Sequence, residues 1–479
     1  MEPKYNRAKL WQLVCFDLNN VASNVYLFLL GFVNLYAGNV AGLAVMFVSN
    51  VIMLSRFWDG VTDPIIGFIM DKTSGRFGKF RPFMLLGNLI MFGTTLLMFT
   101  TTHLVPEGFR GIYWILVYMV YIIGYTFQNT ATRGGQTVLT NDPEQRPIFA
   151  RIDSIAVSLE MAGLAYYLTT YLTAKHHGFT GPLFIEAILV LGVISLALTI
   201  LGIIAISEKD KPENYAALGE NARYGFKDIF RIIKRNRAIQ MLVVAASTDK
   251  LAMQIRRNSV VGIMLYGIIM GNYSLNGKMS LITLIPGIII VTLGTGFAAK
   301  FSSKSATIIF TWASIIFTTL LGALFIFGDP TQISLEHINF MTVAFFVLYT
   351  VSNGTNSITT SLAMPMIADC ADYEMYQSGN YVPGLMGAVF GFFDKLVSSF
   401  SSTIIGWCCV LIGFAERFPT QDDPLTSGMF WVALFLFIGT PLIGWVASLI
   451  AMKFYPLDKE KIIEVQDKIA AMKAENAVK

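Results

Sequence analysis

Two aspartates stand four residues apart inside one long apolar stretch of this sequence. Asp59 and Asp63 belong to the run from 43 to 70, in which Arg56 is the other charged residue. Residues four apart on a helix share one face, with Cβ atoms about 5–6 Å apart. Two carboxylates that close cannot both stay ionised in a low dielectric without a cation or a proton. The pair therefore predicts a site for a small cation, H⁺ or Na⁺.

Two neighbours of the pair bear on this prediction. Pro64 lacks an N–H, so the carbonyl of Gly60 loses its helical partner and becomes a spare oxygen ligand. Hard cations prefer such all-oxygen surroundings. Arg56 offers another interpretation, because it stands three residues before Asp59 and could neutralise it in a structural ion pair. Both interpretations stay open.

Polar residues also form a stripe on the first apolar run, from 11 to 36. Asp17, Asn20 and Asn24 are three and four residues apart, so they share one helix face. A polar face turned to lipid is costly, and we expect this one to face the interior of a helix bundle. Its groups suit contact with a hydroxyl-rich solute. Hydrogen bonding between helices is the alternative.

Three further runs carry polar or charged residues. The residues at helical spacing are Asn129, Arg133 and Gln136 in the run 111–139, and Tyr349, Asn353, Asn356 and Thr360 in the run 337–366. Of these, Asn129, Arg133, Asn353 and Asn356 are candidate solute contacts. Lys395 lies beside Asp394 in the run 383–414. Adjacent helical residues diverge by about 100°, so these two need not pair. Lys395 could neutralise the carboxylates of the 43–70 run, or it could form a static ion pair between helices.

The elements that position these residues follow from composition. The chain has 479 residues, of which 54% are apolar and 14% charged, where a soluble protein has about a quarter charged. Apolar runs of about 20 residues can cross about 30 Å of hydrocarbon, and helices satisfy their own backbone there. We predict an all-α membrane protein with twelve transmembrane helices. The predicted spans are 11–36, 43–70, 82–103, 111–139, 149–174, 183–206, 239–270, 279–300, 305–327, 337–366, 383–414 and 426–453.

A charge-rich interruption divides these spans six and six. We predict a six-helix bundle in 1–206, a central loop in 207–238, a second six-helix bundle in 239–454 and a solvated amphipathic tail helix in 455–479. Lys and Arg concentrate in the breaks on one side, which places both termini and the central loop in the cytoplasm. The predicted location is the cell membrane.

The break after residue 70 carries several charges. Asp71, Arg76, Lys79 and Arg81 form a basic turn at a predicted helix end. Such a turn suits a cytoplasmic latch between neighbouring helices. We expect it to gate movement and not to bind solute.

Several kinds of chemistry have no support in the sequence. The four cysteines lack metal-ligand spacing, and the four histidines all lie in breaks. We find no phosphate-cradling glycine loop and no nucleophile–base pair. We therefore expect neither an enzyme nor a nucleic-acid binder, with no cofactor and no metal beyond Na⁺. The expected partners are a small solute and the lipid bilayer, and the expected state is a monomer.

The segment from Arg56 to Gly67 and the turn from Arg76 to Pro82 resemble the glycoside–pentoside–hexuronide:cation symporters. The stretch with Asp369 and Asp372 is similar to that family's segment before its eleventh helix. The resemblance covers nearly the whole chain. It implies a major facilitator fold, alternating access, and symport of a sugar or glycoside with Na⁺, Li⁺ or H⁺.

The resemblance also implies roles for single residues. Asp59 and Asp63 would bind the cation, with Thr62, Thr126 and Asn129 beside them, while Asp17, Arg151 and Lys395 would contact or organise the sugar. Asp369 and Asp372 would join the gating residues. The chain departs from the family pattern at Asn129, where an aspartate is expected, and at Arg133, where a tryptophan is expected.

These departures bear on ion and substrate. Loss of a carboxylate at Asn129 favours H⁺ over Na⁺. The arginines Arg133, Arg256 and Arg257, together with Lys395, favour an anionic solute such as a hexuronide. Internal pairing of Arg133 with Asp17 or Asp59, and of Arg256 with Asp249, would instead leave a neutral cavity. Symport of an amphiphile or other organic solute, and a membrane sensor without transport, remain alternatives.

Overall fold

A computed structural model describes residues 7–73, 75–140, 145–211, 234–298, 300–378 and 383–478. Within these ranges the regular structure is helical, apart from one isolated bridge between Gly75 and Gly78. The chain forms two compact units. Unit 1 comprises Met1–Asn221, Tyr273–Leu281 and Gly406–Gln421, and unit 2 comprises Ala222–Asn272, Ile282–Ile405 and Asp422–Lys479. Most of the predicted central loop lies outside the described residues, so its boundaries stay a prediction.

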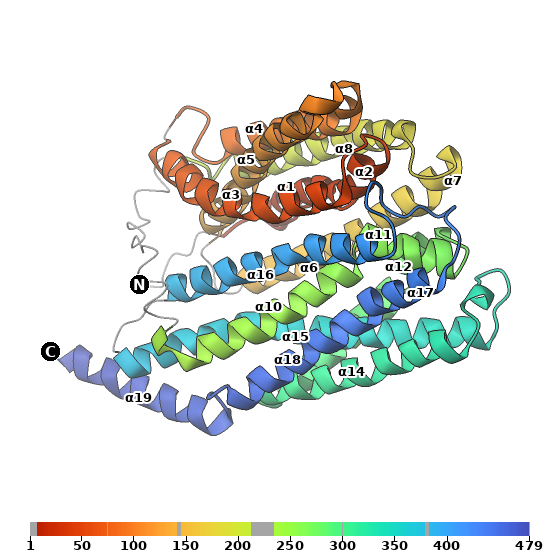
Figure 1. The fold of residues 1–479 in the computed structure, drawn as a ribbon. Coiled ribbons are helices and arrows are strands. Elements are labelled where there is room, and N and C mark those ends of the chain that lie inside the picture. Colours follow the sequence, from red (N-terminus) through yellow and green to blue (C-terminus); the bar gives the residue numbers. More distant parts are fainter. Residues whose placement is uncertain are drawn as a thin grey trace. The chain divides into compact units, whose positions relative to one another are not determined.

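The helices follow one another along each half of the chain with short connections (Figure 1). The first half contains α1 (Leu10–Leu30), α2 (Val33–Asn39), α3 (Val45–Lys72), α4 (Arg81–Thr100), α5 (Glu107–Leu139), α6 (Gln145–Tyr166), the π-helix η2 (Tyr167–Leu172), α7 (Thr173–His176) and α8 (Gly181–Ile206). The second half contains α10 (Arg237–Arg256), α11 (Ser259–Gly262), the π-helix η4 (Ile263–Ile269), α12 (Ser274–Ile282), α13 (Leu284–Ala298), α14 (Ser303–Phe327), α15 (Phe340–Ser378), α16 (Pro383–Leu411), α17 (Ser427–Leu434), the π-helix η6 (Phe435–Gly439), α18 (Thr440–Phe454) and α19 (Lys459–Val478).

Joined where they run on directly, the described helices from α1 to α18 correspond to the twelve predicted spans. Among the described residues, six stretches are long and apolar enough to cross a membrane, and the pair α12 and α13, bent by 44°, would be a seventh. The stretches built on α3, α6, α10, α15 and α16 fall short because charged or polar residues interrupt them. Several candidate site residues lie on these less apolar helices.

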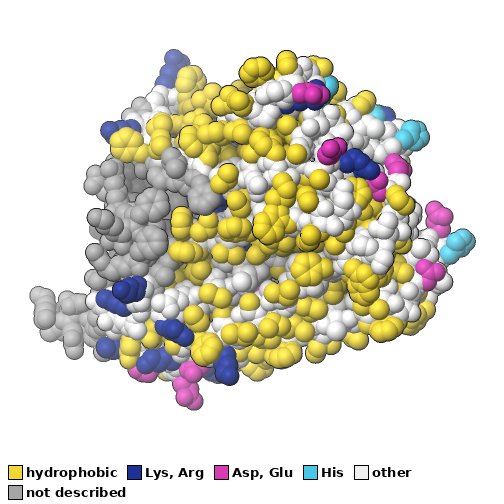
Figure 2. Space-filling view, in the orientation of Figure 1, with side chains coloured by type: hydrophobic (Ala, Val, Ile, Leu, Met, Phe, Trp, Pro, Cys, Tyr) yellow, Lys and Arg dark blue, Asp and Glu magenta, His cyan; other side chains and the backbone are white. Residues whose placement is uncertain are grey.

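The surface has the pattern expected of helices in lipid. Figure 2 shows hydrophobic side chains spread along the helices and charged side chains gathered near their ends. Inside unit 1, polar side chains join helices. Asn88 on α4 donates hydrogen bonds to Ser195 (2.8 Å) and Thr199 (3.0 Å) on α8. Such bonds hold helices together where water is absent.

Helices α4 and α5 approach each other closely at Gly87. A Cβ added at Gly87 would lie 2.7 Å from the carbonyl oxygen of Gly124 and 2.7 Å from the backbone nitrogen of Gln128. These are backbone atoms, so they cannot move aside as a side chain would. Gly93, on the same helix, has no atom within 4 Å of the corresponding position.

We therefore expect Gly87→Ala to destabilise the protein and Gly93→Ala to leave it unchanged. Forcing a methyl group between two packed helices costs about 1–3 kcal/mol. Thermal unfolding of the purified variants in one detergent measures the difference. Equal unfolding temperatures for both variants would mean that α4 and α5 do not cross as closely as described.

Candidate functional site

The two carboxylates of α3 lie in different surroundings. Asp59 is 4% exposed, and its Oδ2 lies 3.4 Å from Nη1 of Arg56. Asp63 is half-buried, and its Oδ1 accepts a hydrogen bond of 3.2 Å from the hydroxyl of Thr126 on α5. The structural ion pair with Arg56 is therefore present, and Asp63 nevertheless meets a second oxygen group from another helix. The two interpretations of the sequence are compatible.

Two other predicted cation residues flank this contact. The hydroxyl of Thr62 donates to the carbonyls of Trp58 (3.1 Å) and Asp59 (3.2 Å), which leaves its oxygen free to act as a ligand. Asn129 is half-buried three residues after Thr126, and so it lies on the same face of α5. Carboxylate, hydroxyl and amide oxygens from α3 and α5 thus form a donor set that fits either Na⁺ or a proton.

The predicted solute residues of unit 1 group around α1. Asp17 is fully buried, and Asn20 donates a hydrogen bond of 2.6 Å to Asp153 on α6. Asn24 is half-buried on the same helix. Arg133 on α5 and Arg151 on α6 are exposed, and within the described residues neither makes a hydrogen bond or ion pair. The alternative, in which Arg133 pairs with Asp17 or Asp59, is therefore not seen among the described contacts.

The predicted solute residues of unit 2 lie on α15 and α16. The side-chain oxygen of Asn356 accepts a hydrogen bond of 3.0 Å from the indole of Trp445 on α18, a contact between helices. Asn353 and Lys395 are half-buried on α15 and α16. Asp394 forms an ion pair with Lys250 of α10. The sequence offered no such partner for Lys250.

Arg256 lies at the end of α10, just before the chain breaks and continues as α11. It is 3% exposed, donates from Nη1 to the hydroxyl of Ser352 (3.1 Å), and stacks 4.6 Å from the ring centroid of Phe437. Its Nε and Nη2 have no hydrogen-bond partner within the described residues. Asp249 instead accepts a hydrogen bond from the hydroxyl of Ser448 (3.3 Å), so the alternative pairing of Arg256 with Asp249 is not seen among the described contacts.

Comparison with known proteins shows the family to which the chain belongs. A family model described as "MFS/sugar transport protein" matches residues 14–459. The chain belongs to this family. It is similar to the inner membrane symporter YicJ of Escherichia coli strain K12, with 26% identity over 94% of this chain and 91% of that protein. It is also similar to the glucuronide carrier protein homolog of the same organism, with 24% identity over 96% and 95%.

A solved structure supports the fold. The crystal structure of the nucleoside transporter NupG covers 94% of this chain and 100% of its own, with a TM-score of 0.59 and 11% identity. At that identity the likeness concerns the fold alone. The chain is thus a multi-pass membrane transporter with the major facilitator fold, of the glycoside–pentoside–hexuronide symporter type, and it is not an enzyme.

The basic turn after α3 is bound by Asp210, a residue that the sequence analysis did not identify. Asp210 follows α8 and is fully buried. Its carboxylate accepts from the backbone N–H groups of Lys79 (2.9 Å), Phe80 (3.1 Å) and Arg81 (3.1 Å), at the start of α4. An anion is favoured at a helix N-terminus, where N–H groups lack partners.

One glycine permits this contact. Gly78 has φ +82°, and a Cβ there would lie 2.2 Å from Oδ2 of Asp210. Arg81 completes the latch with its Nε 3.3 Å from the same carboxylate, whereas Arg76 is exposed. The side chain of Asp71 lies outside the described residues. Asp210 and the start of α4 are far apart in the sequence, so residue spacing gave no signal for their contact.

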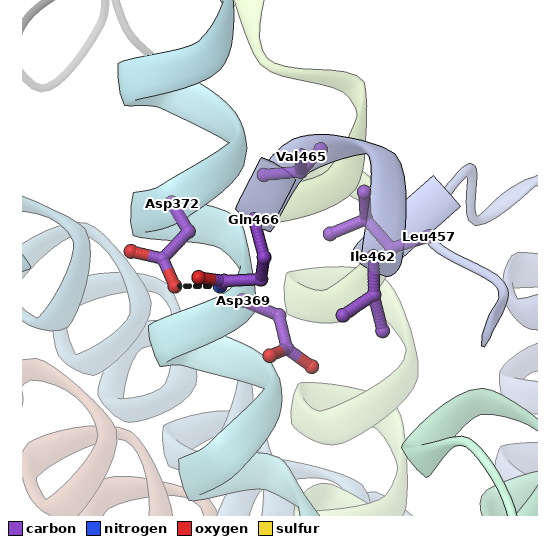
Figure 3. A pocket seen from close by; sticks show the side chains of 6 residues that line it. All are labelled: Asp369, Asp372, Leu457, Ile462, Val465 and Gln466. Atoms are coloured by element: carbon purple, nitrogen blue, oxygen red, sulfur yellow. Dashed lines mark hydrogen bonds between the residues drawn. The ribbon is translucent and has the colours of Figure 1, made fainter. Parts of the chain in front are cut away.

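The remaining gating residues of the transporter meet its tail helix. Figure 3 shows Asp369 and Asp372 on α15 beside Leu457, Ile462, Val465 and Gln466, which together line a small pocket. The side-chain amide of Gln466 donates a hydrogen bond of 2.7 Å to Asp372. Val465 is 2% exposed. The tail is helical as predicted, but the prediction that it is solvated is wrong for this face, because its apolar residues pack on unit 2.

Asp369 lies beyond the predicted end of its span at residue 366. Burial, and then the charge of Asp372, raise the pKa of Asp369 from its ordinary value of 3.8 to about 6. The folded protein therefore binds this proton more tightly than the unfolded chain does. Stability from this group is present at low pH and falls as pH rises toward about 6.

We expect Asp369→Asn, which cannot ionise, to be more stable than the wild type above about pH 6. The two should unfold alike near pH 4. The gain should stay below about 2 kcal/mol, because the carboxyl is partly in contact with water. Unfolding temperatures across this pH range measure it, with Glu336→Gln in an exposed loop as the control. A gain that is the same at every pH would contradict the electrostatic explanation.

Proposed function

We propose that this transporter couples uptake of a glycoside to entry of H⁺ or Na⁺ by alternating access. The coupling ion binds between α3 and α5, at Asp59, Asp63 and Thr126, with Thr62 and Asn129 at its edge. The contact between the Thr126 hydroxyl and Asp63 supports this best, because it brings an oxygen from a second helix to the carboxylate pair. The transporter acts as a monomer in the cell membrane, with both termini in the cytoplasm.

The solute contacts in this proposal are on α1, α5, α6, α15 and α16: Asp17, Asn20, Asn24, Asn129, Arg133, Arg151, Asn353, Asn356 and Lys395. The turn after α3 and the Asp369–Asp372 segment control the change of state. Asp71, Arg76, Lys79 and Arg81 belong to that turn, and Asp210 supplies a partner for it.

Replacing either carboxylate should separate coupling from binding. We expect Asp59→Asn or Asp63→Asn to abolish gradient-driven accumulation, while exchange or binding of solute partly survives. The solute is chosen first, as a glycoside that raises the unfolding temperature of the purified protein with or without Na⁺. Uptake in proteoliposomes then measures gradient-driven accumulation, and counterflow measures exchange of solute. Glu336→Gln is the control. Full accumulation by both aspartate variants would disprove the site.

The solute class can be narrowed further. We propose an anionic glycoside such as a hexuronide. The buried guanidinium of Arg256 supports this, because its Nε and Nη2 have no hydrogen-bond partner within the described residues and its described neighbours are a hydroxyl and aromatic rings. A glucuronide carrier homolog among the relatives points the same way. A solute carboxylate would pair with a guanidinium more strongly here than at a surface.

Glucuronides should therefore compete for binding better than the matching neutral glucosides. Arg256→Gln, which can still donate to Ser352, should weaken glucuronide binding about tenfold to a hundredfold and leave glucosides nearly unchanged. Arg133→Gln should reduce the preference for glucuronides over glucosides less than Arg256→Gln does, because the Arg133 side chain is exposed. Competition against one labelled glycoside measures all three proteins. Better binding of neutral glycosides, with the same ranking in both variants, would show that the arginines are structural.

A further inference from the structure

The face between α1 and α6 gathers carboxyl groups that the proposed ion site does not use. Asp17 of α1 is fully buried, and neither of its carboxylate oxygens has a hydrogen-bond partner within the described residues. Asp153 of α6 lies beside it. The two carboxyl groups are so placed that a proton on one would be hydrogen-bonded to the other.

Two neighbours fix the surroundings of this pair. Asn20 donates a hydrogen bond of 2.6 Å to Oδ1 of Asp153 and so orients that carboxyl group. Glu160 lies seven residues after Asp153, on the same face of α6. Both of its carboxylate oxygens are buried, the side chain of Asn24 is its hydrogen-bonding neighbour, and its charge interacts with those of Asp17 and Asp153. Three acids therefore share one helix–helix face.

No described basic group compensates for them. Helix α1 packs against α4, α5, α6 and α8. The charged groups on those helices and their described partners are Arg81 with Asp210, Arg110 with Glu107, Glu186 with Lys175 and His176, and the exposed Arg133 and Arg151 without partners. Each therefore either binds another partner or is turned to the surface.

An uncompensated carboxylate pair inside a membrane domain is costly. Desolvation disfavours each charge, and like charges in contact add repulsion. A single proton removes the repulsion and the desolvation cost of one charge, and the charge that remains is stabilised by a hydrogen bond between the two groups. A metal ion would need more ligands than this pair, and among the described residues no group of three or more acids, histidines or cysteines is arranged to hold one.

We propose that Asp17 and Asp153 share one proton and form a proton-binding site in unit 1, separate from Asp59 and Asp63. If the proposed function holds, this proton lies next to the predicted solute contacts Asn20 and Asn24. An anionic solute binding there would hold the proton in place, and losing the proton would expel the solute. The proton site itself does not depend on that coupling.

Infrared difference spectroscopy of the purified protein in lipid tests the site without any solute. Wild-type protein should show the C=O band of a protonated carboxyl at about pH 7, where an ordinary aspartate has lost its proton. Asp17→Asn should lose the component of this band that belongs to the pair, and Glu160→Gln identifies any component from Glu160, whose carboxylate oxygens are also buried. Asp153→Asn keeps an oxygen that can accept from Asn20 but removes one charge, so its band should titrate at lower pH than that of the wild type.

Two controls separate this site from the others. Glu336→Gln in an exposed loop and Asp59→Asn on α3 should both keep the band, so failure of the proposed ion site would not affect this result. If Asp17→Asn does not fold, the shift in Asp153→Asn decides alone. A wild type without the band, or a band unchanged in both Asp17→Asn and Asp153→Asn, would overturn the proposal. So would a band that Na⁺ removes at constant pH, because the pair would then bind a metal cation.

Discussion

The structure depends on one constraint, which is the cost of a charge where no water can solvate it. A charged side chain at the centre of a bilayer costs about 2.5–3.5 kcal/mol on insertion scales. The described charged residues within the helices reduce this cost through different contacts. Asp59 lies near Arg56, and Lys250 pairs with Asp394. Helices α3, α10 and α16, which carry these four residues, are among those too polar to be identified as spans by composition.

The same constraint explains why the fold was predictable. Long apolar runs and the charged breaks between them are local features, so the sequence alone located every helical stretch from α1 to α18. The interior irregularities were not visible. The π-helices η2, η4 and η6 lie within stretches predicted as single spans, and the break between α10 and α11 falls at Arg257 and Asn258, inside the predicted span 239–270. Hydropathy does not change where the backbone changes its hydrogen-bonding pattern, so a run of this kind reads as one helix.

The candidate site was predictable to the extent that its residues share a helix. Asp59 and Asp63 follow from spacing, and Thr126 followed from the family resemblance. Contacts between distant parts of the chain were missed. Asp210 matters because it meets the start of α4, and Asp153 because it meets α1. The tail was misjudged for a similar reason, since its alternating charges suggested solvation while Val465 and Ile469 are buried.

Both units hold buried charged groups with atoms that lack hydrogen-bond partners within the described residues. In unit 1 these atoms are both carboxylate oxygens of Asp17, and in unit 2 they are Nε and Nη2 of Arg256 and one oxygen of Asp249. Static structural roles do not account for both sets, because each set costs free energy that an apolar residue would avoid. A proton for the acids and a carboxylate for the arginine would remove both costs. These are the two ligands that a proton-coupled carrier of an acidic solute would move together. We infer that the unbalanced charges are kept because the transported species neutralise them, so that the empty transporter is the strained state and binding of both ligands relieves it.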